Sequence, residues 1–114
     1  MKKNISIFFL TLCFLNVNSQ STFFQSYGGN GNDYGENIIS CTDSGFAAIG
    51  ATESYGNGLT DLYIIKTNNI GEVIWHKTFG GPNIDYGKSI VETADSGFIA
   101  CGYSNSQNLN YDVF

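Results

Sequence analysis

The chain repeats itself at a fixed interval of 52 residues. Residues 26–54 align without gaps with residues 78–106, and 13 of the 29 aligned positions are identical. A period of this length is typical of propellers and solenoids, whose units cannot bury their apolar faces alone and therefore stack on one another. The repeat positions that we expect to maintain the structure are Gly28, Gly29, Asp33, Gly35, Asp43, Gly45, Phe46, Gly80, Gly81, Asp85, Gly87, Asp95, Gly97 and Phe98.

Each repeat predicts four short strands joined by polar, glycine-rich turns. The expected strands are residues 35–42, 46–52, 61–67 and 72–79 in the first repeat and residues 87–94 and 98–104 in the second. The Asp-Ser-Gly turns that begin at Asp43 and Asp95 suit tight hairpins, because glycine adopts positive φ without a steric penalty. Segment 46–52 is apolar on both faces, which favours a strand covered on both sides. The predicted fold class is all-β, built from the four-stranded antiparallel blades of a β-propeller.

Both ends of the repeat region predict an incomplete N-terminal fragment of a longer propeller. Residues 22–29 align with residues 74–81 at the same offset of 52, so we expect the fourth strand of a blade whose first three strands are missing. Residues 112–114 align with the start of a third strand at 61–63. We therefore expect two stacked antiparallel sheets. The predicted organisation is a signal peptide at residues 1–19, an N-terminal strand and loop at 20–34, a complete repeat at 35–86 and a truncated repeat at 87–114.

The first 19 residues have the organisation of a secretory signal peptide. Lys2 and Lys3 precede an apolar stretch at residues 5–17, and the small residue Ser19 suits cleavage before Gln20. The chain after cleavage keeps three lysines, no arginine and ten acidic residues, and thus a net charge of −7. This charge argues against nucleic-acid binding and against anionic membranes, which both require a cationic surface. We expect an exported protein, extracellular or on the outer cell surface, that is not an integral membrane protein.

Two motifs resemble repeats in secreted proteins of Bacteroidota-type bacteria. They are DLYIIKTNNIGEVIWHKTFGG at residues 61–81 and DYGKSIVETADSGFIACGYS at residues 85–104. The family pattern runs D-x-G-x-S-I, then D-G-G-F-I-x-x-G, then L-I-K-T and W-x-K-T-Y-G-G, and the resemblance covers nearly all of residues 22–114. It implies β-propeller blades in surface or exported proteins that often carry a C-terminal sorting domain. The resemblance implies no catalytic residues.

Aspartates that recur in both repeats are the main candidates for site chemistry. Asp33 lies in the sequence GGNGND, which matches the start of a calcium-binding nonapeptide, and Asp85 is its equivalent in the second repeat. Both are weak calcium candidates, because Gly35 interrupts the match where an apolar residue is required. The alternative is a loop in which the carboxylate caps backbone amides. Paired glycosidase carboxylates are disfavoured, since residues present in every repeat usually stabilise every repeat.

The remaining reactive side chains predict no catalytic centre. His76 is the single histidine and lies in an expected strand, so we expect a packing or strand-surface role rather than a metal site. Cys41 and Cys101 occupy non-equivalent repeat positions, which favours buried free thiols over a disulfide and leaves their oxidation open. We expect no cofactor.

The function predicted from these features is that of a secreted or cell-surface repeat module acting as a non-catalytic scaffold or binding platform. Its expected partners are further blades of the same polypeptide and an extracellular protein or glycan. The alternative is the N-terminal part of a propeller enzyme, for example one that acts on polysaccharide, whose active residues lie beyond Phe114.

Overall fold

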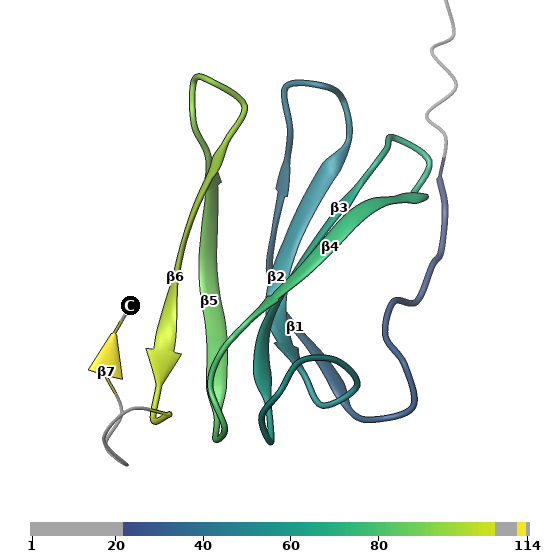
Figure 1. Ribbon diagram of the computed structural model, residues 1–114. Helices are drawn as coiled ribbons and strands as arrows, with labels where there is room; N and C mark the ends of the chain where they lie inside the picture. The colour runs from purple at the N-terminus through teal and green to yellow at the C-terminus, as the bar shows by residue number, and fades with distance from the viewer. Residues whose placement is uncertain (1–21, 107–111, 114) are drawn as a thin grey trace, which may run out of the picture.

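The computed structural model describes residues 22–106 and 112–113, so the predicted signal peptide lies outside the described residues. The described residues form seven strands and no helix, which confirms the predicted all-β class (Figure 1). The strands are β1 (Asp33–Ser40), β2 (Phe46–Thr52), β3 (Asp61–Thr67), β4 (Val73–Phe79), β5 (Asp85–Glu92), β6 (Phe98–Ser104) and β7 (Asp112–Val113). This part of the chain accordingly has no helix with the length and apolar character needed to cross a membrane.

The strands form two antiparallel sheets in which each strand pairs with its neighbours in the sequence. The first sheet has the order β1-β2-β3-β4, and the second has the order β5-β6-β7. Figure 1 shows the first sheet in blue to green and the second beside it in green to yellow. The expectation of two antiparallel sheets is confirmed. Over the described residues the sheets form an open pair and not a closed ring.

The first strand of each repeat begins and ends two residues earlier than the sequence predicted. The start is earlier because Asp33 already pairs with Thr52 across the β1–β2 hairpin. The end is earlier because the Cys41 N–H donates to the Gly45 carbonyl oxygen at 2.8 Å and closes the turn there. The first sheet therefore begins inside the segment that was expected to be an N-terminal strand and loop.

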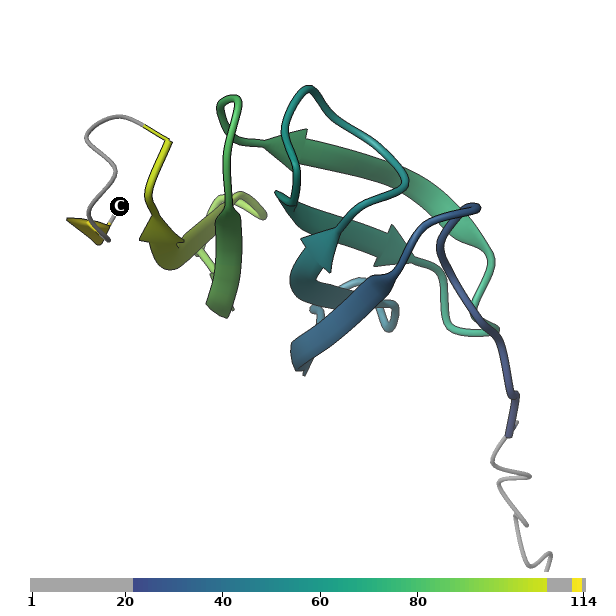
Figure 2. The same ribbon diagram turned by 90° about the horizontal axis from the view of Figure 1, so that it is seen from below.

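The two sheets pack face to face around one core (Figure 2). Strand β5 lies against β1, β2 and β3. The core contains Cys41, Ala47, Ile49, Leu62 and Ile64 from the first sheet and Ile90 from the second. All seven residues of β3 are buried, and β2 has only partly or fully buried residues. These two central strands are thus covered on both sides, in agreement with the apolar residues on both of their faces.

Gly87 allows the closest approach between the two sheets. A Cβ atom at this position would lie 2.4 Å from a side-chain carbon of Ile49 and 2.9 Å from one of Leu62, so a larger residue would push the sheets apart. Gly35 is the repeat equivalent of Gly87 in β1. Its Cβ position has no atom within 4 Å, because no sheet among the described residues covers this outer face of the first sheet.

The N-terminal segment, residues 22–32, contains no strand, although the sequence predicted one at residues 22–29. A strand requires a neighbour that satisfies its backbone groups, and this segment is instead held by side chains. Phe23 packs against Phe46 with ring centroids 6.0 Å apart, and the Tyr27 hydroxyl donates to the Gly71 carbonyl oxygen at 2.7 Å. The segment therefore lies on the outer face of the first sheet, opposite to the second sheet.

Both cysteines among the described residues are free, but only Cys41 is buried. Cys101 is exposed, so the prediction of a buried thiol at this position is wrong. The physical reason is its place in the stack. Cys101 is the repeat equivalent of Ile49, which faces the second sheet, whereas Cys101 faces away from the first sheet.

Candidate functional site

The carboxylate of Asp33 joins the loop before β1 to the loop after β2. Its Oδ2 atom accepts hydrogen bonds from the Gly29 N–H at 2.9 Å and from the Ser54 hydroxyl at 2.7 Å. Its Oδ1 atom accepts a short hydrogen bond from the Thr52 hydroxyl. Because Asp33 begins one strand and Thr52 ends its partner, the carboxylate ties the open end of the hairpin together.

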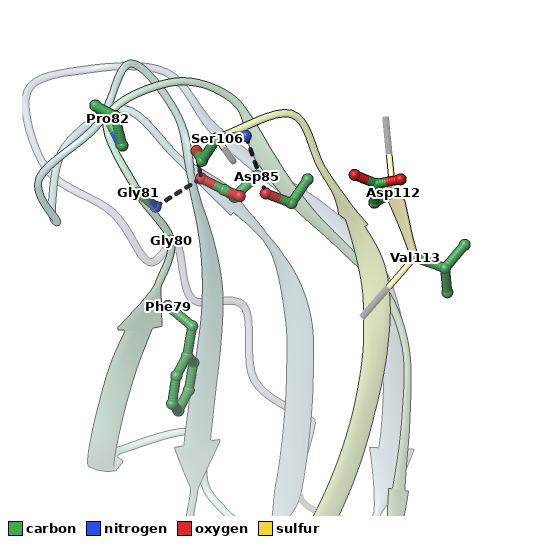
Figure 3. A pocket seen from close by; sticks show the side chains of 9 residues that line it. Phe79, Gly80, Gly81, Pro82, Asp85, Ser106, Asp112 and Val113 are labelled. Carbon is green, nitrogen blue, oxygen red and sulfur yellow. Dashed lines mark hydrogen bonds between the residues drawn. The ribbon is translucent and has the colours of Figure 1, made fainter. Parts of the chain in front are cut away.

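Asp85 repeats this arrangement in the second sheet (Figure 3). Its Oδ2 atom accepts hydrogen bonds from the Gly81 N–H at 2.9 Å and from the Ser106 hydroxyl at 2.6 Å. The Ser104 side chain, in the position equivalent to Thr52, also donates to this carboxylate. We refer to Asp33 and Asp85, each with its amide and two hydroxyl donors, as the aspartate anchors.

Hydrogen bonding favours the ionised form of both aspartate anchors. Burial alone raises the pKa of Asp33, but donors from Thr52, Ser54 and Gly29 outweigh it and hold the pKa below its ordinary value of 3.8. The pKa of Asp85 is lowered by the same balance of burial and hydrogen bonds. The donors around these carboxylates are N–H and O–H groups, which is the arrangement of an amide-capping loop. Within residues 22–106 and 112–113, no three His, Cys, Asp or Glu side chains gather into a metal-ligand group.

A second buried carboxylate lies near Asp85, with Gly80 between the two. Asp61 begins β3, is 2% exposed and accepts a hydrogen bond from the Gly58 N–H at 3.0 Å. A Cβ atom at Gly80 would lie 2.3 Å from Asp61 Oδ1 and 2.7 Å from Asp85 Oδ2. The two carboxylates therefore flank the backbone of Gly80.

A pocket of about 500 Å³ opens beside Asp85 (Figure 3). Its lining residues are Phe79, Gly80, Gly81, Pro82, Asp85, Ser104, Ser106, Asp112 and Val113. The polar side chains of Asp85, Ser104 and Ser106 are already engaged, since Ser106 donates both to Asp85 and, through its backbone N–H, to Ser104 Oγ at 3.1 Å. The exposed side chains of Phe79 and Val113 add apolar surface. This pocket has the size of a ligand site, but the polar side chains of Asp85, Ser104 and Ser106 in its lining serve the anchor.

The hairpin aspartates Asp43 and Asp95 lie in the turns, where the sequence placed them. Asp43 accepts hydrogen bonds from the Gly45 N–H at 2.9 Å and from the buried Lys66 Nζ at 2.8 Å. The hydrogen bond from Lys66 lowers the pKa of Asp43. Asp95 accepts instead from the Thr93 hydroxyl and, at 3.3 Å, from the Gly97 N–H. The turn hydrogen bond is thus present in both repeats, whereas the ion pair belongs to the first.

His76 lies on β4 among aromatic rings. Its ring centroid is 5.3 Å from that of Tyr55 and 5.5 Å from that of Tyr63. The Tyr55 hydroxyl in turn donates to the Gly28 carbonyl oxygen at 2.9 Å. The histidine therefore packs in a ring cluster on the outer face of the first sheet.

A partly exposed group of three tyrosines forms a further surface feature that was not predicted from the sequence. Tyr34 and Tyr86 are repeat equivalents with ring centroids 6.2 Å apart, and Tyr86 stacks on Tyr103 at 5.3 Å. Lys88 Nζ lies 5.8 Å from the Tyr86 ring and 5.5 Å from the Tyr103 ring, and it forms a 2.7 Å ion pair with Glu36. We call Tyr34, Tyr86 and Tyr103 the tyrosine cluster. Its signal in the sequence was the identical tyrosine in both repeats.

Comparison with protein-family models, with curated proteins and with solved structures gave no match to this chain.

Proposed function

We propose that this chain is an exported repeat module of the β-propeller type that acts as a non-catalytic scaffold or binding platform. The main support is that Asp33 and Asp85, which are shared by both repeats, have the same structural role in both. The aspartate anchors bind the same kinds of donor at equivalent positions. Antiparallel sheets that stack face to face are also the elements of propellers. A catalytic centre requires one set of residues, whereas a scaffold requires the same set in every unit.

The surface of this module that best suits a ligand is the tyrosine cluster. One tyrosine from each repeat contributes to it, and Tyr34 is 43% exposed. Tyrosine combines an apolar ring face with a polar hydroxyl, and it is enriched at protein interfaces. Because the chain has a formal net charge of −5 and lacks arginine, a neutral glycan or a protein without strong negative charge fits this surface better than a polyanion does.

Arrays of polysaccharides and of extracellular proteins test this function. The wild-type chain should bind a member of one of these classes without converting it. Tyr34→Ala should weaken binding at least about tenfold, as expected for loss of an interface anchor. Val73→Ala is the matched control, because Val73 is similarly exposed but lies on β4. Chemical turnover of a bound polysaccharide, or equal binding by the two variants, would contradict the proposal.

A further inference from the structure

Each sheet has one apolar face that no other sheet covers among the described residues. On the second sheet this face carries Val91, Ile99, Cys101 and Val113, and Ile99 and Val113 are 62% and 84% exposed. We call it the trailing face. On the first sheet, Ile38 is 65% exposed on the outer side, beside the open Gly35 position. We call this surface, which includes Gly35, Ile38 and Phe46, the leading face.

The trailing and leading faces are the repeat equivalents of two faces that already fit together. Cys101 and Val113 correspond to Ile49 and Leu62, which contact the second sheet in the core. Gly35 and Ile38 correspond to Gly87 and Ile90, which form the other side of that contact. The glycine that lets one sheet approach the other is therefore present on the leading face as well.

The N-terminal segment strengthens this equivalence. Phe23 precedes Trp75 by 52 residues, and Phe46 precedes Phe98 by the same interval. The two ring pairs have matching geometry, with centroids 6.0 Å apart for Phe23 and Phe46 and 5.8 Å apart for Trp75 and Phe98. Trp75 lies on β4, the edge strand of the sheet that covers Phe98. The segment at Phe23 thus occupies the place of an edge strand on the leading face, and the place of the other strands beside it is open.

Charges on the two faces are complementary too. Across the observed interface, Glu36 of the first sheet forms an ion pair with Lys88 of the second at 2.7 Å. These residues are repeat equivalents with opposite charges, so the contact of a trailing face with a leading face would again bring Lys88 next to Glu36. Tyr86 would likewise meet Tyr34, as it does within one chain at 6.2 Å.

We propose that two copies of this chain dock head to tail, with the trailing face of one copy on the leading face of the next. Strands β5, β6 and β7 of the first copy then lie beside the N-terminal segment of the second and complete a sheet of the same type. The interface is heterologous, so repeated docking gives a ring if the rotation closes and an open chain if it does not. This inference rests on the proposed function in one respect: both treat the sheets as stacking repeat units.

A disulfide between copies tests the predicted register. Gly35 is the repeat equivalent of Gly87, and Cys101 is the equivalent of Ile49. In the docked pair, the new thiol of Gly35→Cys would therefore lie against the native Cys101 of the neighbouring copy, as Gly87 lies against Ile49 within one copy. A disulfide requires Cβ atoms about 3.5–4.5 Å apart. In the observed interface a Cβ atom at Gly87 would lie 2.4 Å from Cγ1 of Ile49, so this register would bring the two cysteines into direct contact. In a Cys13→Ser background, mild oxidation of Gly35→Cys should give a ladder of covalent oligomers on a non-reducing gel.

Two controls make this result specific. Adding Cys101→Ser to Gly35→Cys should abolish the ladder, because the remaining native thiol, Cys41, is buried. Leu59→Cys should give no ladder, since Leu59 is exposed in the β2–β3 loop outside both faces. An equal amount of cross-linked product from Gly35→Cys and Leu59→Cys would overturn the proposed docking.

Light scattering on separated and mixed variants tests the head-to-tail geometry. Ile38→Lys disables the leading face and Ile99→Lys the trailing face, and both positions are exposed, so each variant should fold. Each should self-associate more than about tenfold more weakly than wild type, because docking would bury an unpaired ammonium. An equimolar mixture should form dimers and nothing larger, since only one intact pair of faces remains.

The outcomes separate this inference from the proposed function. A wild-type chain that stays monomeric at its highest soluble concentration overturns the second copy as the occupant of these faces. The same holds if neither lysine substitution changes the association. Neither result affects the binding difference between Tyr34→Ala and Val73→Ala, by which the module's function is judged.

Discussion

The two sheets follow one sequence pattern, but their equivalent residues have different surroundings. Ile49 is 1% exposed because the second sheet covers it, whereas its equivalent Cys101 is exposed on the trailing face. Ile90 is likewise 1% exposed, whereas its equivalent Ile38 is 65% exposed. The burial of an apolar residue in this protein is therefore decided by whether a neighbouring sheet is present, and not by the repeat position alone.

The loop ends of the two sheets show the opposite behaviour. The aspartate anchors have the same partners in both sheets, at distances that agree within 0.1 Å for the Oδ2 contacts. These contacts join segments of one hairpin, so they do not depend on stacking. The loop structure is therefore determined within a single repeat, whereas the core forms only where a neighbouring repeat is present.

The largest expected effect concerns the pair Ile49 and Cys101. Ile49→Ala should destabilise the protein by about 2–5 kcal/mol, because it removes a fully buried side chain and leaves a cavity. Cys101→Ala should change stability by no more than about 0.5 kcal/mol, as for other surface substitutions. Urea unfolding of the two variants, at a protein concentration too low for docking between copies, measures both values. Similar losses in the two variants under these conditions would mean that Cys101 is covered within a single copy.

Gly87 and Gly35 provide the next comparison. Gly87→Val should destabilise the protein by about 1–3 kcal/mol, because the new side chain collides with Ile49 and Leu62 and the packed core resists expansion. Gly35→Val has open space around its Cβ position and should cost less than about 1 kcal/mol. Thermal unfolding of both variants at low protein concentration gives the difference. Equal costs would contradict the close approach of the sheets at Gly87.

The sequence predicted the local elements of this fold well, because they rest on short-range chemistry. Strands β2 and β3 have the predicted bounds, and the Asp-Ser-Gly turns close hairpins at their predicted positions. The positive φ in these turns, however, belongs to Ser44 and Ser96, so its assignment to the following glycines was wrong. The exposure of Cys101 could not be predicted, because it depends on a neighbouring sheet. The missing strand at residues 22–29 has the same origin, since a strand forms only where an edge is available for pairing.

The site was harder to predict than the fold. The repeated aspartates were visible in the sequence, but their hydroxyl partners, such as Ser54 and Ser106, lie 21 residues further along the chain and meet them only after the hairpin closes. The tyrosine cluster arises from contact between sheets, and Tyr103 has no tyrosine at the equivalent position in the first repeat. Sequence periodicity indicates which residues recur, but it does not indicate which of them are in contact in the folded protein.

The aspartate anchors predict a specific dependence of stability on pH. The pKa of Asp85 is lower in the folded protein than its ordinary value of 3.8. Its contribution to the free energy of unfolding is therefore complete at pH values well above 3.8, and it is lost as the pH falls through the folded pKa. Asp85→Asn should cost about 1–3 kcal/mol at neutral pH, because buried donors lose a charged acceptor. The variant should also lose less stability than wild type on acidification from about pH 5 to pH 2.

Asp33 supplies the comparison for this prediction. The Asp33 anchor has equivalent donors but is less buried than the Asp85 anchor. Asp33→Asn should therefore lose less stability at neutral pH than Asp85→Asn does, and its stability should depend on pH with the same sign. Urea unfolding across this pH range measures both variants. If the stability of wild type and of Asp85→Asn fell in parallel with acid, the carboxylate would have no stabilising role.

The smallest expected effect concerns the N-terminal segment, whose local stability is compared with that of the core strands. Tyr27 corresponds to Phe79, the last residue of β4, and it differs by the hydroxyl that donates to Gly71. Tyr27→Phe removes that hydrogen bond and keeps the ring, so the cost should be about 0.5–1.5 kcal/mol. Because the Phe23–Phe46 ring contact remains, the loss should appear as faster amide exchange over residues 22–27, with the protection of β2 and β3 unchanged. Equal acceleration in the segment and in β2 and β3 would show that the segment unfolds together with the core and is not a separate unit of local unfolding.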